Sequence, residues 1–364
     1  MGYILRNIGQ KARLILDISV ITLSFMGTIF VISAEWYYVN LQSFNQLLFL
    51  FLGLILFYAF SLIPYNFWAR LSLALYFLSL PFLLLPIYFG GGRWIRLGHL
   101  SIQPYEFTKI AIVLFLAFLL TLTRNSKSSW RKTLLPFLFL IPPTLILVRQ
   151  PHFGACFILI STAVVMLYLA GIKFKHLFIT FLIAFLLLAL LLPLEGYRIK
   201  RLASSYGNDH LGTGYQKRQA LIAIGSGGPF GKGLGRGTMK LGYLPEASSD
   251  FLFAVEAEEM GLIFTLLLFF LPLCLFLLSG FSVSFSATNP LASLIAGGLT
   301  SLIAIQTLTN LSMVSIKFVP VIGIPLPFFA HGGSSLISSF IAAGIIRNIA
   351  RQKEVETIWR KESK

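Results

Sequence analysis

Charged residues are scarce in this sequence, and their scarcity excludes a water-soluble enzyme. Only 12% of the 364 residues are Asp, Glu, Lys or Arg, whereas 57% are hydrophobic. Soluble proteins average roughly 25% charged and about 45–50% apolar residues. This chain could neither hide its apolar side chains in one core nor stay dissolved. Intrinsic disorder is excluded as well, because disordered chains are poor in aromatic residues and this one has 35 Phe.

Cysteine is nearly absent too. The two cysteines, Cys156 and Cys274, both lie in apolar runs, so the sequence contains neither a disulfide framework nor a zinc motif. We therefore predict no metal ligands. A divalent cation as cofactor is possible but cannot be read from the sequence.

Long apolar runs dominate what is present. A helix that crosses a bilayer needs about 20 apolar residues, and ten such runs can be recognised. We predict an all-α polytopic membrane protein, in which residues 1–364 form one membrane domain with about ten transmembrane helices. The predicted spans are residues 14–34, 46–65, 71–89, 107–122, 133–148, 153–171, 176–194, 251–279, 291–315 and 327–349.

The distribution of Lys and Arg predicts the orientation. If the N-terminus is inside, the short inner segments and the C-terminal tail hold most of these residues, and the rule that positive charge stays inside is satisfied. We therefore predict a multi-pass protein of the cytoplasmic membrane with both termini in the cytoplasm. The short outer loops hold only Arg93, Arg96, Arg149 and Lys317.

One predicted outer loop, residues 195–250, is long and strongly basic. The net charge of +16 could indicate nucleic-acid binding, but no basic helix interleaved with polar residues is present. We predict no nucleic-acid partner. Basic residues on the outer face indicate an anionic ligand instead, such as a lipid head group or a pyrophosphate. The eight basic residues are Arg198, Lys200, Arg201, Lys217, Arg218, Lys232, Arg236 and Lys240.

Three segments at the predicted outer face contain the unusual residues. The first reads GGGRWIRLGHLSIQPYEFTK, from Gly90 to Lys109. Glu106 and Lys109 lie three residues apart, so we expect both on one face of the fourth span, in its first turn. An ionisable residue within a span is a functional candidate. The alternative is an ion pair that only holds two helices together.

The second segment is the glycine-rich end of the long loop, between Gly225 and Gly237. Its glycines are interspersed with Lys232, Arg236 and, just beyond, Lys240. Such a loop can expose backbone N–H groups that bind phosphate oxygens, although it is not a P-loop. A flexible linker is the alternative.

Asp250 follows this loop, at the entrance to the eighth span, and is one of only three aspartates. Its position suits a helix N-cap, where the helix dipole would favour the carboxylate. A capping role alone is the alternative. Glu256, Glu258 and Glu259 come next, too deep in the span for solvated charges.

The third segment begins near Asn310 and reads VPVIGIPLPFFAHGGSSLISS from Val319 to Ser339. Its three prolines predict an irregular backbone, which is tolerated at membrane depth only where it is buried in protein or lines a cavity. Ser334 and Ser335 open the last helix and are candidate ligand contacts, although close helix packing explains small residues equally well.

These three segments, in this order, resemble the SEDS family of bacterial membrane proteins, which includes RodA and FtsW. RWIRLG followed by QPYEFTK, RQPHFG at 149–154, LPEASSDFLF with AEEMG, and NLSMV with IPLPF and GGSS are similar to four separate family motifs. GKGLGRGT, AEE and NLSMV…IPLPF are closer to RodA, the elongation member, than to FtsW, the division member.

The resemblance implies a peptidoglycan glycosyltransferase. Such an enzyme polymerises lipid II into glycan strands, with inversion, on the outer face of the cytoplasmic membrane. A class B penicillin-binding protein that crosslinks the strands is the implied partner, besides membrane lipids. Asp250, Glu106 and Lys109 match the family's essential residues. We expect lipid II and its pyrophosphate to contact Arg93, Gln103, Lys232, Arg236, Lys240, Ser334 and Ser335.

Three positions depart from the family pattern. His152 replaces an Asp, Tyr105 replaces a Ser, and Ala330-His331 replaces Ser-Tyr. Because His152 removes a carboxylate, no acid role is expected there, and an altered substrate or a reduced activity stays open.

Three other functions stay open: a lipid II flippase, an FtsW-like division polymerase, and a non-catalytic activator of a penicillin-binding protein. A flippase needs polar residues along a whole transmembrane path. The candidate residues Glu106, Lys109 and Asp250 instead gather at the predicted outer face, which favours the polymerase.

Overall fold

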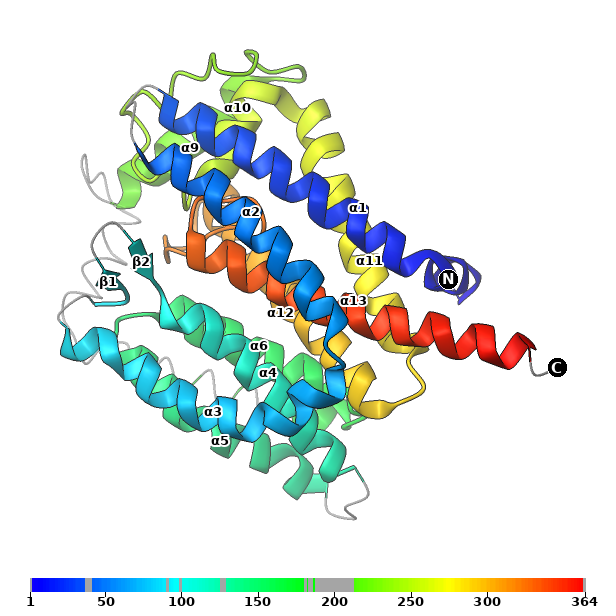
Figure 1. The fold of residues 1–364 in the computed structure, drawn as a ribbon. Helices are drawn as coiled ribbons and strands as arrows, with labels where there is room; N and C mark the ends of the chain where they lie inside the picture. The colour runs from blue at the N-terminus through cyan, green and yellow to red at the C-terminus, as the bar shows by residue number, and fades with distance from the viewer. Residues whose placement is uncertain are drawn as a thin grey trace.

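The chain was analysed as a computed structural model, which describes residues 2–36, 41–89, 92–97, 100–124, 129–179, 182, 186 and 213–362. Helices dominate, and a small two-stranded antiparallel hairpin is the sheet seen in these ranges (Figure 1). The elements are α1 (Gly2–Glu35), α2 (Leu41–Leu62), α3 (Tyr65–Tyr88), β1 (Ile95–Leu97), β2 (Leu100–Ile102), α4 (Pro104–Leu122), α5 (Ser129–Arg149), α6 (Phe153–Leu169), α9 (Thr213–Gly227), α10 (Leu252–Thr265), η3 (Leu266–Phe270), α11 (Leu271–Ser286), α12 (Pro290–Ser315) and α13 (Gly333–Glu362).

Seven helical segments are long and apolar enough to cross a membrane, which confirms an all-α polytopic membrane protein. Shorter apolar stretches in α5 and α6 match two more of the predicted spans. The predicted span 176–194 lies mainly outside the described residues, so the total of ten stays a prediction. The seven segments are Lys11–Glu35, Asn45–Leu62, Tyr65–Tyr88, Pro104–Leu122, Leu252–Ser286, Pro290–Ser315 and Gly333–Gln352.

One boundary and one helix differ from the sequence prediction. The last span begins at Gly333 and not at 327, because the proline-rich residues 316–332 are not helical. The long loop also contains a helix, α9, which was not expected. It packs against α10 and buries Ala220 and Ala223.

The spans α4, α12 and α13 are the most buried, so they form the centre of the bundle. Around them, α2 packs on α13, α3 on α4, α6 on α12, and α1 on α11. In Figure 1, the start of α1 and the end of α13 lie at one end of the bundle. The hairpin and the loop before α10 lie at the opposite end, here called the loop end. The segments with the candidate residues therefore converge at the loop end.

A glycine interrupts the eighth span where the loop packs against it. Gly261 has φ 70° and ψ 180°, a conformation outside the helical region. A Cβ at this position would stand 2.2 Å from the backbone nitrogen of Gly231 and 2.7 Å from the carbonyl carbon of Phe230. The break frees the N–H groups of Leu262 and Ile263, which donate to the carbonyl oxygens of Gly228 and Pro229 at 2.9 and 3.1 Å.

We predict that Gly261→Ala destabilises the protein. The backbone strain of a side chain in this φ/ψ region costs about 1–3 kcal/mol, and the contact with Gly231 adds to that cost. Gly225→Ala is the matched control, because a Cβ there meets nothing within 4 Å. Alanine is also favoured over glycine inside a helix, by about 1 kcal/mol. Thermal unfolding in detergent should show a lower Tm for the first variant only. Equal Tm values would contradict the assigned conformation.

Candidate active site

Two amide side chains on α12 connect the predicted catalytic residues. Gln306 accepts a hydrogen bond from Lys109 Nζ through its Oε1 at 2.6 Å. Asn310 donates from Nδ2 to the backbone carbonyl of Asp250 at 2.9 Å. Four residues along a helix rise about 6 Å, roughly one turn. The contacts to Lys109 and Asp250 therefore lie on one face of α12, about one turn apart.

The same amides hold the irregular segment between α12 and α13. Gln306 Nε2 donates to the carbonyl of Pro325 at 3.0 Å, and Asn310 Nδ2 donates to the carbonyl of Ile324 at 2.6 Å. The proline-rich backbone is thereby fixed over the face of α12 that holds Lys109 and Asp250. This is the buried irregular backbone that the sequence predicted.

Glu106 and Lys109 form a buried ion pair, with Lys109 Nζ 2.5 Å from Glu106 Oε2. Glu106 lies in the first turn of α4, which Pro104 opens, and Lys109 follows three residues later on the same face, one turn deeper than the sequence predicted. Ser338 of α13 donates to the same carboxylate oxygen at 2.8 Å. Through Gln306 and Ser338 the pair joins α4, α12 and α13, so it is in a position to organise the site as well as to stabilise the helices.

Asp250 is not a helix N-cap, which corrects the sequence prediction. The N-cap position of α10 is Phe251, and it has no side-chain cap. Asp250 lies in the preceding turn, which closes when the Phe251 N–H donates to the carbonyl of Glu246 at 3.2 Å. The helix therefore starts later than the sequence suggested, at Leu252.

Asp250 and Arg93 come together around Gly323. A Cβ on Gly323 would stand 3.3 Å from Asp250 Oδ2 and 3.4 Å from Arg93 Nη1. Gly323 also has φ 64°, which favours glycine. Arg93, just before β1, is oriented by its Nη2, which donates to the carbonyl of Pro151 at 2.6 Å. A carboxylate and a guanidinium from distant segments thus flank one point at the loop end.

Gln103, Ser334 and Ser335 lie where the hairpin meets the start of α13. The Gln103 N–H donates to Ser334 Oγ at 3.0 Å. Gln103 Oε1 and Ser335 Oγ are buried and have no hydrogen-bond partner among the described residues. Buried polar atoms are costly when unpaired, so these two are suited to bind a ligand group or water.

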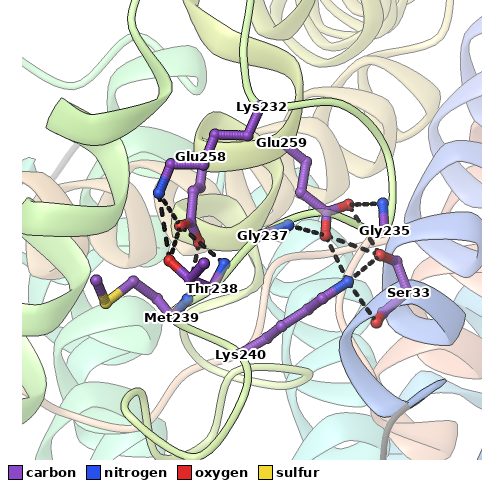
Figure 2. A network of polar contacts seen from close by, with 9 residues as sticks. All are labelled: Ser33, Lys232, Gly235, Gly237, Thr238, Met239, Lys240, Glu258 and Glu259. Carbon is purple, nitrogen blue, oxygen red and sulfur yellow. Dashed lines mark hydrogen bonds and ion pairs between the residues drawn. The ribbon is translucent and has the colours of Figure 1, made fainter.

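The glycine-rich loop binds carboxylates of the chain itself (Figure 2). Glu258 is fully buried and accepts hydrogen bonds from Lys232 Nζ at 2.6 Å, from the N–H and Oγ1 of Thr238 at 3.0 and 2.8 Å, and from the Met239 N–H at 3.1 Å. Four donors from the loop therefore surround one carboxylate of α10.

Glu259 is bound in the same way and also reaches α1. It accepts from Lys240 Nζ at 2.6 Å and from the N–H groups of Gly235 and Gly237 at 3.1 and 3.3 Å. Ser33 Oγ of α1 donates to both of its oxygens, at 2.9 and 2.8 Å. We call Glu258, Glu259, Lys232, Lys240 and Ser33, with the loop N–H groups they bind, the glutamate network.

The glutamate network changes the interpretation of the loop. Its N–H groups and two of its lysines bind an anion, as the sequence suggested, but the anion is a pair of glutamates. Lys240 is buried and both lysines are paired with these glutamates, and their contact with pyrophosphate stays a prediction. Arg236 remains exposed. A flexible linker does not fit either, because the loop is held by buried hydrogen bonds.

Two of the departures from the family pattern touch each other. The rings of Tyr105 and His152 meet edge to face, with centroids 5.1 Å apart. Burial, together with the positive charges of Arg93 and Lys109, lowers the pKa of His152 well below its usual 6.5. The imidazole is therefore neutral at pH 7, beside two cations.

The third departure, His331, lies close to the Asp250 turn. Its N–H donates to the carbonyl of Ser248 at 2.9 Å, and its Nδ1 lies 3.3 Å from Glu35 Oε1 at the end of α1. His331 thereby connects the α12–α13 segment and α1 to the turn that presents Asp250.

Gln306, Gly323 and Ser338 shape the site but were not predicted from the sequence, and Asn310 was recognised only as the start of the third segment. Gln306 and Asn310 are amides four residues apart in an apolar span, and that spacing could have revealed a shared polar face. No pattern in the sequence indicates Gly323 or Ser338, because their roles depend on contacts between distant segments. In the described part of the chain, no three His, Cys, Asp or Glu side chains gather as a metal site.

Comparison with known families decides the assignment. Residues 13–355 match the model of a family described as cell cycle protein, which covers FtsW, RodA and SpoVE. The chain belongs to this family. The SEDS resemblance of the sequence motifs is thereby confirmed, and it extends over nearly the whole chain.

Individual relatives agree. This SEDS protein is 37% identical to stage V sporulation protein E of Bacillus subtilis over 322 residues, which are 84% of this chain and 86% of that protein. It is 36% identical to a probable peptidoglycan glycosyltransferase FtsW of Coxiella burnetii, covering 85% of this chain and 86% of the relative.

Solved structures show the same fold. One, described as the structural coordination of polymerization and crosslinking by a peptidoglycan synthase complex, superposes with a TM-score of 0.78 and 26% identity, over 93% of this chain and 97% of the other. The rod shape determining protein RodA of Thermus thermophilus gives a TM-score of 0.69 and 25% identity, over 93% and 96% of the two chains.

We predict that Lys240→Met destabilises this SEDS protein more than Lys232→Met does. Removing one partner of a buried ion pair costs about 3–5 kcal/mol, and Lys240 is buried whereas the Lys232 side chain is 31% exposed. Unfolding in detergent should give the larger fall in Tm for Lys240→Met. Equal falls would argue against a buried charge at Glu259.

We also predict a stability loss at acidic pH that depends on His152. Its pKa is lower in the folded than in the unfolded protein, so the unfolded state binds more protons below pH 6.5. Stability is therefore retained above that pH and lost as the pH falls, by at most about 1.4 kcal/mol per pH unit. Between pH 7.5 and 5, Tm should fall further for the wild type than for His152→Gln. Parallel pH profiles would show that His152 does not contribute.

Proposed function

We propose that this chain, a peptidoglycan glycosyltransferase, polymerises lipid II into glycan strands and uses Asp250 as its general base. The observation that supports this most directly is the convergence at the loop end. Asp250 and Arg93 flank Gly323, and Lys109 is held one turn away along α12. A carboxylate and two cations therefore lie in the neighbourhood that the reaction requires.

The reaction needs these charges for two separate tasks. Asp250 accepts the proton of the acceptor 4-hydroxyl as that oxygen forms a bond to C1 of the donor sugar. The bond between C1 and the pyrophosphate oxygen breaks on the opposite side, and its electron pair leaves with the pyrophosphate. Because the attack comes from the opposite face, the α linkage of lipid II becomes a β linkage, so the enzyme inverts.

The leaving pyrophosphate gains negative charge, which fixed cations stabilise. Arg93 and Lys109 are suited to this role, since Arg93 is oriented by the Pro151 carbonyl and Lys109 by Glu106 and Gln306. Gln103, Ser334 and Ser335 would contact the sugar or the phosphate from the start of α13. Arg236, exposed on the loop, would meet the substrate before it reaches the site.

The position of the polar residues favours polymerisation over lipid flipping. A flippase would require polar side chains along the whole transmembrane path. In the opposite half of the bundle, Arg347 of α13 and Asp17 of α1 are instead paired with each other, with Arg347 Nε 2.7 Å from Asp17 Oδ1. Their charges therefore join two helices. The site residues gather at the loop end.

We further propose that the loop end faces outward from the cytoplasmic membrane and that both termini are cytoplasmic, as the Lys and Arg distribution indicates. A class B penicillin-binding protein is the proposed partner. A solved relative with the same fold belongs to a peptidoglycan synthase complex that coordinates polymerization and crosslinking, which supports such a partner.

For the cellular role we propose cell elongation, on the basis of the RodA-like motifs GKGLGRGT and NLSMV…IPLPF and the RodA fold match. A role in division is the second candidate, favoured by the relatives named FtsW at 32–36% identity.

We predict that Asp250→Asn strongly slows polymerisation without unfolding the protein. General-base catalysis contributes about 10²–10⁴-fold, so the rate of glycan synthesis from labelled lipid II should fall at least about a hundredfold. The backbone contact to Asn310 does not involve the exchanged carboxylate, so Tm should be nearly unchanged.

Glu246→Gln is the matched control, because Glu246 is an exposed carboxylate of the same turn. It should retain activity with and without the penicillin-binding partner. An Asp250→Asn protein that folds and still makes glycan strands at a normal rate would remove Asp250 from the mechanism.

A further inference from the structure

The span that follows Asp250 is longer than a membrane requires. Its candidate segment, Leu252–Ser286, has 35 residues, whereas about 20, and at most about 25, suffice to cross the hydrocarbon core. The surplus is at the loop end. Residues 252–261 are buried apart from the half-buried Met260, while exposed apolar side chains begin at Leu262, which is 63% exposed.

The change from buried to exposed occurs at the break at Gly261. Ile263, Phe264, Leu266 and Leu267 continue the exposed apolar surface beyond Leu262. An apolar surface of this kind on a spanning helix faces lipid. Counting about 20–25 residues back from Ser286 also reaches this point. The boundary of the hydrocarbon core therefore lies close to Gly261.

The glycine-rich loop is bonded to that same boundary. Gly228 and Pro229 accept hydrogen bonds from Leu262 and Ile263, the first residues of the lipid-facing surface. Phe230 follows directly and its side chain is 68% exposed. Its backbone contacts the Gly261 break, so Phe230 is attached to the chain beside the first lipid-facing turn.

The rest of the loop has the composition of a membrane-interface segment. Leu234, Leu241 and Tyr243 are exposed apolar or aromatic residues, and Arg236 is an exposed cation. Aromatic rings prefer the head-group region of a bilayer, and basic side chains beside them attract anionic lipid phosphates.

We propose that residues 228–243 form a membrane-interface anchor, which inserts Phe230 into the head-group region of the adjacent leaflet and places Arg236 against lipid phosphates. Lipid is the occupant because the loop continues a lipid-facing helix surface. The proposal does not depend on glycosyl transfer. Since the glutamate network joins the loop to α10 and α1, the anchor also fixes the depth of the Asp250 turn relative to the lipid head groups.

Site-directed spin labelling in nanodiscs tests the anchor. The discs contain phosphatidylglycerol and phosphatidylethanolamine and the full chain alone. Exposed Cys274 is replaced by Ala, while Cys156 is buried and stays. Labels are placed at Phe230→Cys and Leu234→Cys, with Leu266→Cys as the lipid-facing reference and Thr288→Cys, an exposed polar residue between α11 and α12, as the water-facing reference.

We expect the accessibility of the label at 230 to be closer to that of the label at 266 than to that of the label at 288. Its relaxation by a water-soluble nickel chelate should be several-fold weaker than at 288, and its relaxation by oxygen stronger, with position 234 intermediate. Equal chelate accessibility at 230 and 288 overturns the proposal. Protection of 230 that appears only after a penicillin-binding partner is added also overturns it, in favour of a protein interface.

Discussion

Two buried glutamates determine how the loop end is built. A carboxylate removed from water costs several kcal/mol unless charges and hydrogen bonds replace the water. Glu258 and Glu259 obtain both from the glycine-rich loop, and Glu259 also from Ser33 of α1. Glycines are suited to the loop because the backbone N–H groups of Gly235 and Gly237 must approach a carboxylate closely. The segment that leads to Asp250 is thereby fixed to two helices.

The glutamate network and the candidate site differ in how completely their polar atoms are paired. Every oxygen of Glu258 and Glu259 accepts at least one hydrogen bond. At the site, Gln103 Oε1, His152 Nδ1 and Ser335 Oγ are buried and have no partner among the described residues. Native proteins leave few such atoms unpaired without a reason. The fully paired glutamate network is therefore a structural contact, whereas the unpaired polar atoms at the candidate site are suited to bind a polar ligand.

Local patterns in the sequence were sufficient to locate most of the described spans and the Glu106–Lys109 pair, because hydropathy and the i, i+3 spacing act within one helix. They were insufficient where a contact joins distant segments. Ser33 and Glu259 are 226 residues apart, and no local pattern links them. The glycines and lysines did indicate an anion, but not that Glu258 and Glu259 supply it. The predicted start of α10 was wrong for a related reason. The turn that the Glu246 carbonyl closes places the first helical residue after Asp250, at Leu252.

The contact between Tyr105 and His152 suggests how the site tolerates its departures from the family pattern. A carboxylate at position 152 would lie beside Arg93 and Lys109 and compensate part of their charge. The neutral imidazole leaves that charge for an incoming anion, while Tyr105 fills the space between His152 and the ammonium group, which lies 5.8 Å from the Tyr105 ring centre. Lys109 still has Glu106 as its partner, and the charge of Arg93 meets Asp250 across Gly323. We therefore propose that the exchange leaves more positive charge for an incoming anion and keeps the proposed base in place.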